Sequence, residues 1–448
     1  MGLPMNAPRH SDAARPERAA SAAHRAVQPV PVPPQPVLPF VLAGPEETLI
    51  GQGCLGQLEV GPAPLEARVR AYFAARPEGP RVLVGALPYD IDAPAHLVQP
   101  AAFARQAGRA DLAALLPRQP SPGSATTGSA DAGPGSSSSA VVRPAAPVLA
   151  PVSRWRVMAE PTLPAYRAAV AAALAAMARS DSGRDPQALR KIVLSRSLRL
   201  AADRPIDAQA LLQALARDTS VTTFCIPLAG TPEGGVFIGA TPELLVSKSG
   251  ASVLSHPLAG SARRHADPAA DRRAAEALTV SEKDGREHRA VVEAILDQLA
   301  PHCLDLGTPE GTRVISTATM WHLGTRIVGR LRDPSMSSLE LAALLHPTPA
   351  VCGAPRAVAA RAIPGLEGYD RGFYAGAVGW CDAAGDGAWH VAIRCARIAG
   401  GEARLYAGAG IVPGSDPVAE GEETSAKFAA LLQAFGIDED GRPLEAGA

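Results

Sequence analysis

The sequence predicts an α+β fold in which antiparallel strands are covered by helices. Helix and strand patterns alternate from residue 163 onward, and the closing strands are joined by short glycine-containing turns. The chain lacks the GxxxxGK[ST] motif of a phosphate-binding loop, so nothing indicates a parallel nucleotide-binding sheet of that kind. Together these observations favour antiparallel layers with helices on the outside.

Composition excludes several protein classes. The 448 residues carry a net charge of −1, which lacks the basic excess of a nucleic-acid-binding protein. We find no run of about 18 apolar residues, so we expect no membrane span. The six cysteines are scattered without a CxxC pair, so we expect neither a zinc site nor a disulfide framework. The N-terminus lacks the apolar segment of a signal peptide, and we expect a cytoplasmic protein.

The way amino-acid composition changes along the chain predicts one large domain. Residues 1–38 end in a proline-rich stretch and are expected to form a disordered tail. Residues 39–437 carry the ordered patterns, interrupted by a low-complexity insertion of Ser, Gly, Ala and Pro at 118–147. Residues 438–448 are expected to be a C-terminal tail.

Periodicity places the individual elements. We predict helices at 65–77, 163–180, 280–300 and 415–436, the last stopped by Gly436. We predict strands at 81–90, 191–200, 236–250 and 252–260. The segments at 372–382, 387–400 and 403–415 are expected to form three successive strands of a meander.

Two of the predicted helices carry acidic pairs near their starts. Asp284 and Glu287 share one helix face, and Glu420 and Glu423 share another, with Lys427 one turn further on. Two such helices facing each other could hold Mg²⁺, which prefers oxygen ligands. The alternative is a solvated acidic face, because acids are favoured near helix N-termini.

Single charged residues in apolar segments are candidates for acid–base chemistry. Lys191 opens a largely apolar strand, either as an edge residue whose ammonium reaches solvent or as a desolvated base. Glu243 follows Pro242 in an apolar segment, either as an exposed turn residue or as a general acid with a raised pKa. Arg394, on a strand, could pair with a carboxylate of a ligand.

The order of short segments is more specific than any one of them. In sequence the chain carries KIVLSR, GATPELL, HPLAGSARR, KDGREH, STATMWHLGT, HPTPAVCG, RGFYAGAVGW, IRCA, AGAGIVPGSDPVAEGEETSAKF and LQAFG. Together they resemble the chorismate-utilising enzyme family, which includes isochorismate, salicylate, anthranilate and aminodeoxychorismate synthases. The resemblance covers 155–437 strongly and 40–117 weakly. PLAGSARR, HPTPAVCG and YAGAVGW look most like isochorismate synthases of siderophore pathways.

The resemblance implies a fold and a reaction. The fold is that of anthranilate synthase component I: two packed antiparallel sheets with helices outside and the active site between. The reaction is Mg²⁺-dependent conversion of chorismate to isochorismate by addition of water at C2 and loss of the C4 hydroxyl. A monomer is expected, because members of this branch of the family are often monomers, and no glutaminase subunit is expected, because water and not ammonia is the nucleophile.

The resemblance also assigns roles to residues. Lys191 matches the general base and Glu243 the general acid. Glu287 and Glu423 match Mg²⁺ ligands, with Asp284 and Glu420 as further acids that reach the metal directly or through water. The positions that match contacts to chorismate are Gly260, Ser261, His322, Ala350, Tyr374, Arg394, Gly408 and Lys427.

Three alternatives to an isochorismate synthase stay open. A salicylate synthase adds pyruvate elimination, and such relatives tend to carry Thr at the position of Ala350. An aminating synthase would need ammonia from a partner, and the SAR that follows PLAG argues against it. A catalytically silent subunit is disfavoured because every matched acid, base and metal position is intact.

Overall fold

The computed structural model describes residues 38–116, 154–180, 185, 187–231 and 234–444. The predicted tail and the insertion at 118–147 lie outside these residues, apart from residue 38. Among the described helices, none combines the length and the apolar character needed to cross a membrane. Residues 438–444, expected as tail, form a turn in which Pro443 pairs with Ile437 through an isolated β-bridge.

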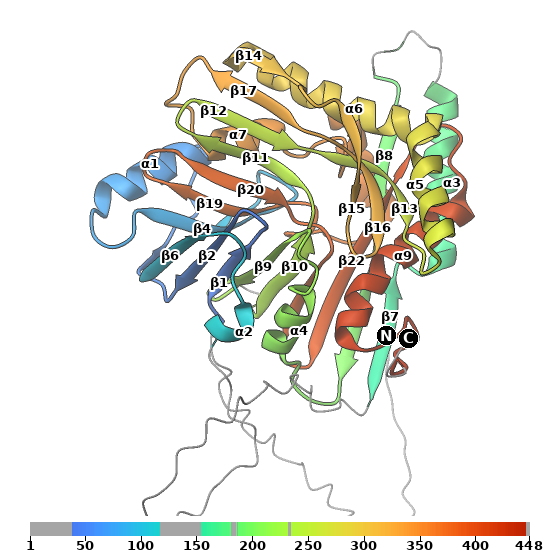
Figure 1. Ribbon diagram of the computed structural model, residues 1–448, viewed down its shortest axis with the longest axis horizontal. Coiled ribbons are helices and arrows are strands. Elements are labelled where there is room, and N and C mark those ends of the chain that lie inside the picture. Colours follow the sequence, from blue (N-terminus) through green and yellow to red (C-terminus); the bar gives the residue numbers. More distant parts are fainter. Residues whose placement is uncertain (1–37, 117–153, 181–184, 186, 232–233, 445–448) are drawn as a thin grey trace, which may run out of the picture. The chain divides into compact units, whose positions relative to one another are not determined.

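Two large antiparallel sheets form the framework (Figure 1). In spatial order, the ten-stranded sheet comprises β18 (Gly353–Ala354), β8 (Lys191–Ala202), β22 (Glu402–Ile411), β21 (Cys395–Ala399), β10 (Val236–Thr241), β9 (Thr222–Pro227), β1 (Phe40–Ala43), β2 (Glu47–Gln52) and β6 (Ala102–Ala107), with β7 (Trp155–Glu160) paired to β8. The nine-stranded sheet comprises β14 (Cys303–Gly307), β17 (Ile327–Leu331), β12 (Ser252–His256), β11 (Leu244–Ser249), β20 (Gly387–Val391), β19 (Ala377–Asp382), β4 (Val82–Leu87), β5 (His96–Gln99) and β3 (Gly56–Gln57).

A smaller sheet and the helices complete the layers. The three-stranded sheet comprises β13 (Leu258–Arg263), β16 (Met320–Thr325) and β15 (Thr312–Ser316). The helices are α1 (Leu65–Ala75), α2 (Leu112–Leu115), α3 (Leu163–Ser180), α4 (Ala208–Leu215), α5 (Pro268–Val280), α6 (Glu282–Leu299), α7 (Ser338–Leu345), α8 (Arg356–Glu367) and α9 (Pro417–Phe435), with a 3₁₀ turn at Ala300–His302.

Buried apolar side chains explain why the sheets stack. Phe224 and Phe237 from the ten-stranded sheet share one core with Val246, Val378 and Trp389 from the nine-stranded sheet. Burial of this apolar surface is the main force that holds the two sheets together. The α+β architecture with two packed antiparallel sheets is therefore confirmed.

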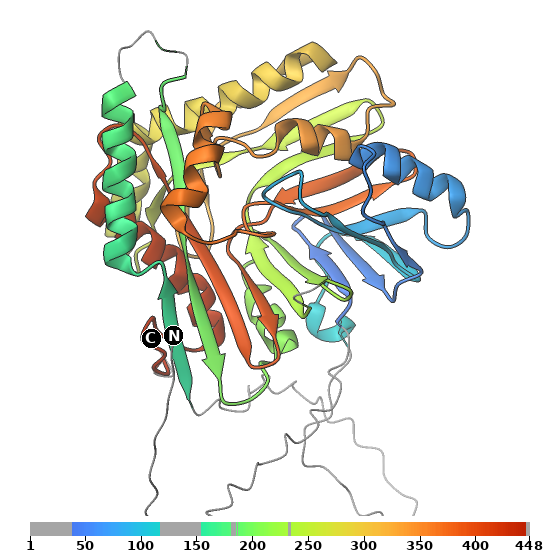
Figure 2. The same cartoon turned by 180° about the vertical axis from the view of Figure 1, so that it is seen from behind.

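Helices cover the face of the ten-stranded sheet that points away from the nine-stranded sheet. Leu211 of α4 and Phe428 of α9 pack against strand residues such as Ile238. Val170 of α3 and Ile363 of α8 form a separate buried cluster with Ile192 of β8. Figures 1 and 2 show α3 and α9 side by side near β8 and β22, with α1 at the far end of the sheets.

Most of the predicted elements are confirmed. The helices at 163–180, 280–300 and 415–436 correspond to α3, α6 and α9, and the strand at 191–200 is the first part of β8. Gly436 ends α9 in the left-handed conformation with φ of 72°, as a C-terminal glycine stop requires.

The predicted three-strand meander is wrong. Segment 387–400 forms two strands, β20 and β21, that belong to different large sheets. The chain changes sheets at Ala392–Arg394, where Arg394 adopts a left-handed conformation with φ of 50°. Apolar alternation continues on both sides of this break, and a non-glycine residue with positive φ leaves no signal in the sequence. The break places Arg394 at the functional site.

Candidate active site

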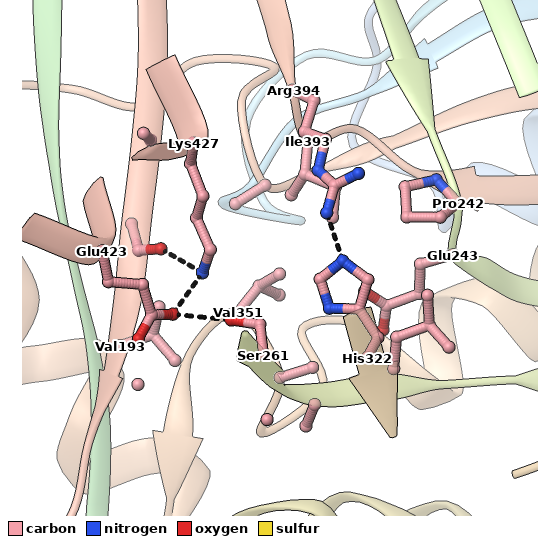
Figure 3. Close-up of a pocket in the computed structure, with 18 of the residues that line it drawn as sticks. Val193, Pro242, Glu243, Ser261, His322, Val351, Ile393, Arg394, Glu423 and Lys427 are labelled. Atoms are coloured by element: carbon pink, nitrogen blue, oxygen red, sulfur yellow. Dashed lines mark hydrogen bonds and ion pairs between the residues drawn. The ribbon is translucent and has the colours of Figure 1, made fainter. Parts of the chain in front are cut away.

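One pocket is lined by residues of the ten-stranded sheet, the small sheet, helices α6 and α9 and the loops between strands (Figure 3). All but three of the residues predicted for the site line it: Glu243, Gly260, Ser261, Glu287, His322, Ala350, Tyr374, Arg394, Gly408, Glu423 and Lys427. Lys191, Asp284 and Glu420 lie behind this lining. The structure therefore brings the predicted residues together, while their roles stay predictions.

Lys191 is held inside the sheet and not at its edge. It starts β8, and its strand runs between β18 and β22. Its side chain is only 2% exposed, so the interpretation as a solvent-reaching edge lysine is wrong. Its Nζ lies 3.1 Å from Glu287 Oε1. This ion pair is possible because Gly410 faces it: a Cβ there would lie 2.1 Å from the same oxygen.

Glu243 provides a buried carboxyl at the opposite side of the pocket from Glu423 (Figure 3). It follows β10, and its side chain is buried, so the exposed-turn interpretation is wrong. Burial raises the pKa of this carboxyl to about 8, although a backbone hydrogen bond from Leu258 and the charges of Lys191 and Arg394 partly oppose the shift. Glu243 is therefore protonated near neutral pH and can donate a proton.

His322 and Arg394 form a hydrogen-bonded pair beside Glu243 (Figure 3). Burial and the neighbouring cations lower the pKa of His322 well below its usual value, so the imidazole is neutral and accepts from the guanidinium. Arg394 also donates to Thr317 Oγ1 at 3.3 Å. Among the described residues, no carboxylate lies within ion-pair distance of Arg394. It is thus available to bind a carboxylate of a ligand.

Glu423 and Lys427 form the other charged group of the pocket. Lys427 Nζ lies 2.7 Å from Glu423 Oε1 and donates to the Gly408 carbonyl at 2.8 Å. Ser261 Oγ donates to the same Glu423 oxygen at 3.0 Å. Burial raises the pKa of Glu423, but Lys427 and Ser261 outweigh burial, and the net shift is downward. Glu423 is therefore an anion at neutral pH.

Two further acids lie on the same helices. Glu420 is buried, and its Oε1 lies 2.7 Å from Lys283 Nζ while its Oε2 has no hydrogen-bond partner. Asp284 lies against Gly260, where a Cβ would come within 2.9 Å of the aspartate Cβ. Burial raises the pKa values of both carboxyls. The sequence did not indicate Lys283 as a partner of this group, although it directly precedes Asp284.

The donor set fits a hard cation. Within the described ranges, no three His, Cys, Asp or Glu side chains already converge into a metal site. All four candidate groups are carboxylates, which Mg²⁺ prefers. Three of them form ion pairs with lysines in this structure: Glu287, Glu420 and Glu423. The unpartnered oxygen of Glu420 is a further donor. A divalent cation bound here would compensate the negative charges that the lysines compensate in this structure.

An aromatic pair forms part of the pocket wall. The rings of Tyr374 and Tyr406 stack with centroids 4.8 Å apart and planes 8° apart. Tyr406 was not among the predicted residues, although it lies two positions before Gly408 and so on the same face of β22. Strand periodicity applied to Gly408 could have identified it.

Comparisons with known proteins find similar sequences and a similar fold. The family described as chorismate binding enzyme matches residues 150–436. Isochorismate synthase DhbC of Bacillus subtilis is 51% identical over 254 residues, which span 56% of this chain and 64% of DhbC. Isochorismate synthase EntC of Escherichia coli is 36% identical over 413 residues, which span 89% of this chain and 95% of EntC. The crystal structure of DhbC from Bacillus anthracis superposes with a TM-score of 0.74 at 37% identity, covering 89% of this chain and 95% of that one.

Proposed function

This chain belongs to the family of chorismate-binding enzymes, and we propose that it is an Mg²⁺-dependent isochorismate synthase. The observation that carries the proposal is the buried carboxyl of Glu243 in the same pocket as two cationic side chains, Arg394 and Lys427. The similarity to isochorismate synthases DhbC and EntC supports the same reaction.

The pocket suits a dianion. Chorismate carries two carboxylates, and a neutral pocket could not compensate their charge. Arg394 has no carboxylate partner among the described residues and can form a bidentate contact with one carboxylate. Lys427 supplies a second positive charge on the Glu423 side. We therefore place one substrate carboxylate at Arg394.

The reaction needs two proton transfers, one by an acid and one by a base. Glu243 would protonate the C4 hydroxyl as the C4–O bond breaks, so that it leaves as water. Lys191, in its amine form, would take the proton from the water that forms the new C2–O bond. The two ring double bonds shift, and no electrons are gained or lost overall. Neutral His322 keeps Arg394 in place without adding charge.

The proposed metal ligands are Glu287 and Glu423, with Asp284 and Glu420 holding it directly or through water. When bound, Mg²⁺ would neutralise and orient the carboxylate on the substrate ring. Removing the metal with EDTA should abolish turnover, and adding Mg²⁺ should restore it. Full activity of the metal-free protein would contradict the assignment.

Incubation of the purified protein with chorismate and Mg²⁺, followed by product chromatography, tests the function. We expect isochorismate without a matching amount of pyruvate. Equal amounts of salicylate and pyruvate would instead identify a salicylate synthase. Anthranilate or aminodeoxychorismate, formed with added ammonium, would identify an aminating synthase. Light scattering of the same sample should show a monomer, the oligomeric state we propose.

We further propose that the isochorismate supplies siderophore synthesis. The segments PLAGSARR, HPTPAVCG and YAGAVGW, which resemble isochorismate synthases of such pathways, support this assignment. Deleting the gene should prevent growth under iron limitation, and 2,3-dihydroxybenzoate or salicylate should restore it. Restoration by a menaquinone instead would contradict the pathway.

A further inference from the structure

Between β18 and β7, the edge of β8 is completed in part by side chains. β18 is two residues long and pairs with Lys191 and Ile192, while β7 pairs only from Ser197 onward. Three residues beyond Ile192, the Ser195 N–H donates to Glu367 Oε1 at 2.6 Å. The carbonyl of Val193 accepts from Arg371 Nη2 at 2.8 Å. These are backbone groups that a longer β18 would have bonded.

Arg371 connects this edge to a second segment of the pocket. Its Nη1 donates to the Val351 carbonyl at 2.7 Å, and its Nε donates to Glu367 Oε2 at 2.9 Å. Its guanidinium carbon lies 4.4 Å from the centroid of the Tyr89 ring. Both charged side chains are almost completely buried, at 2% and 1% exposure. One guanidinium therefore contacts β8, the loop that follows Ala350, and the end of α8.

The groups that Arg371 holds belong to the pocket wall, whereas Arg371 itself does not. Val193 and Val351 line the pocket (Figure 3), and Lys191 lies two residues before Val193. Tyr374, another lining residue, donates its backbone N–H to the Arg371 carbonyl at 2.9 Å. We propose that Arg371, oriented by Glu367, is a positioning residue that fixes the Lys191 strand relative to the Ala350 loop.

The chemistry of the guanidinium explains why an arginine is needed. A planar fork can donate to two carbonyls and a carboxylate at once. A lysine would keep the charge balance with Glu367 but could not bridge the Val193 and Val351 carbonyls with the same geometry. Arg371→Lys should therefore lower kcat for chorismate by about tenfold or more, because misplacement of a reacting group affects the transition state most. KM should change by less than about threefold, since Arg371 does not contact the substrate.

A double variant separates positioning from stability. Arg371→Met alone leaves the Glu367 charge buried without a partner and should lower Tm. The double variant Glu367→Gln, Arg371→Met removes both charges, and we expect it to recover most of that Tm while kcat stays low. Lys248→Met is the matched control, because Lys248 forms a 2.7 Å ion pair with Asp386, is just as buried, and does not line the pocket. It should lower Tm and leave kcat within about twofold of wild type.

Recovery of kcat together with Tm in the double variant would overturn the inference, since the pair would then act only on stability. A rise in KM at unchanged kcat in Arg371→Lys would overturn it as well. The inference rests on the proposed function only in that chorismate is the substrate used to measure kcat and KM. Chorismate consumption and each product are therefore measured separately. A wild type that consumes chorismate without forming isochorismate would contradict the proposed function, while the ratio of consumption rates among the variants still decides the role of Arg371.

Discussion

Two glutamates face each other across the pocket and have opposite properties. Glu243 lies beside His322 and Arg394 but forms no ion pair with a described residue, and burial raises its pKa to about 8. Glu423 lies against Lys427 and Ser261, which outweigh burial and lower its pKa. The comparison shows that the immediate partners of a carboxyl, more than its place in one pocket, decide whether it donates a proton or carries a charge.

Replacing the protonated glutamate should have the largest effect. Glu243→Gln keeps the shape and the hydrogen-bonding capacity of the neutral acid but has no acidic proton. We expect kcat to fall by about 10²–10⁴-fold without loss of Tm, measured by chorismate consumption and thermal unfolding. Raising the Mg²⁺ concentration should not restore activity. A kcat within tenfold of wild type would exclude Glu243 as the acid.

Replacing the anionic glutamate should lower activity in a way that a high Mg²⁺ concentration reverses. Glu423→Gln removes a charged oxygen ligand, so we expect Mg²⁺ affinity to fall by about 10–100-fold. Titration of activity with Mg²⁺ measures this shift, and high Mg²⁺ should recover a large part of kcat. If both glutamine variants showed the same Mg²⁺ dependence as wild type, the two glutamates would not differ in the way proposed.

The same contrast predicts a pH dependence of stability. Folded Glu243 keeps its proton up to pH about 8, whereas an unfolded glutamate releases it near 4.5. The folded state therefore binds more protons in this window, and the free energy of unfolding decreases as pH rises through it. Wild type should lose Tm relative to Glu243→Gln as the pH rises from about 5 to 8. Glu423→Gln should follow wild type there, because a lowered pKa affects stability only at acidic pH.

The smallest expected effect concerns Ala350, which lines the pocket. Thr is β-branched and adds a hydroxyl, so it would narrow the space beside the substrate. Ala350→Thr should lower isochorismate formation and raise the fraction of turnovers that release pyruvate, measured with lactate dehydrogenase. No increase in pyruvate would show that Ala350 does not separate this chain from salicylate synthases.

The sequence predicted the acidic pairs on two helices and the isolated Lys191 and Glu243, because helix spacing and apolar context are local properties. It left the ionisation of these groups open, since that depends on partners far away in the chain: Lys191 meets Glu287, and Glu423 meets Ser261. The change of sheet at Arg394 was missed because a left-handed arginine interrupts no pattern. The Glu367–Arg371 pair was missed because its partners are main-chain carbonyls and amides, which leave no trace in side-chain spacing.

Infrared difference spectroscopy of carboxyl groups tests the contrast between Glu243 and Glu423 most directly. At about pH 6.5, wild type should show the C=O band of a buried protonated carboxylic acid, which disappears in alkaline solution as the pH passes about 8. The band should be absent from Glu243→Gln and retained in Glu423→Gln. A band that persists in Glu243→Gln and is lost in Glu423→Gln would reverse the assignment of the proton donor and contradict the account.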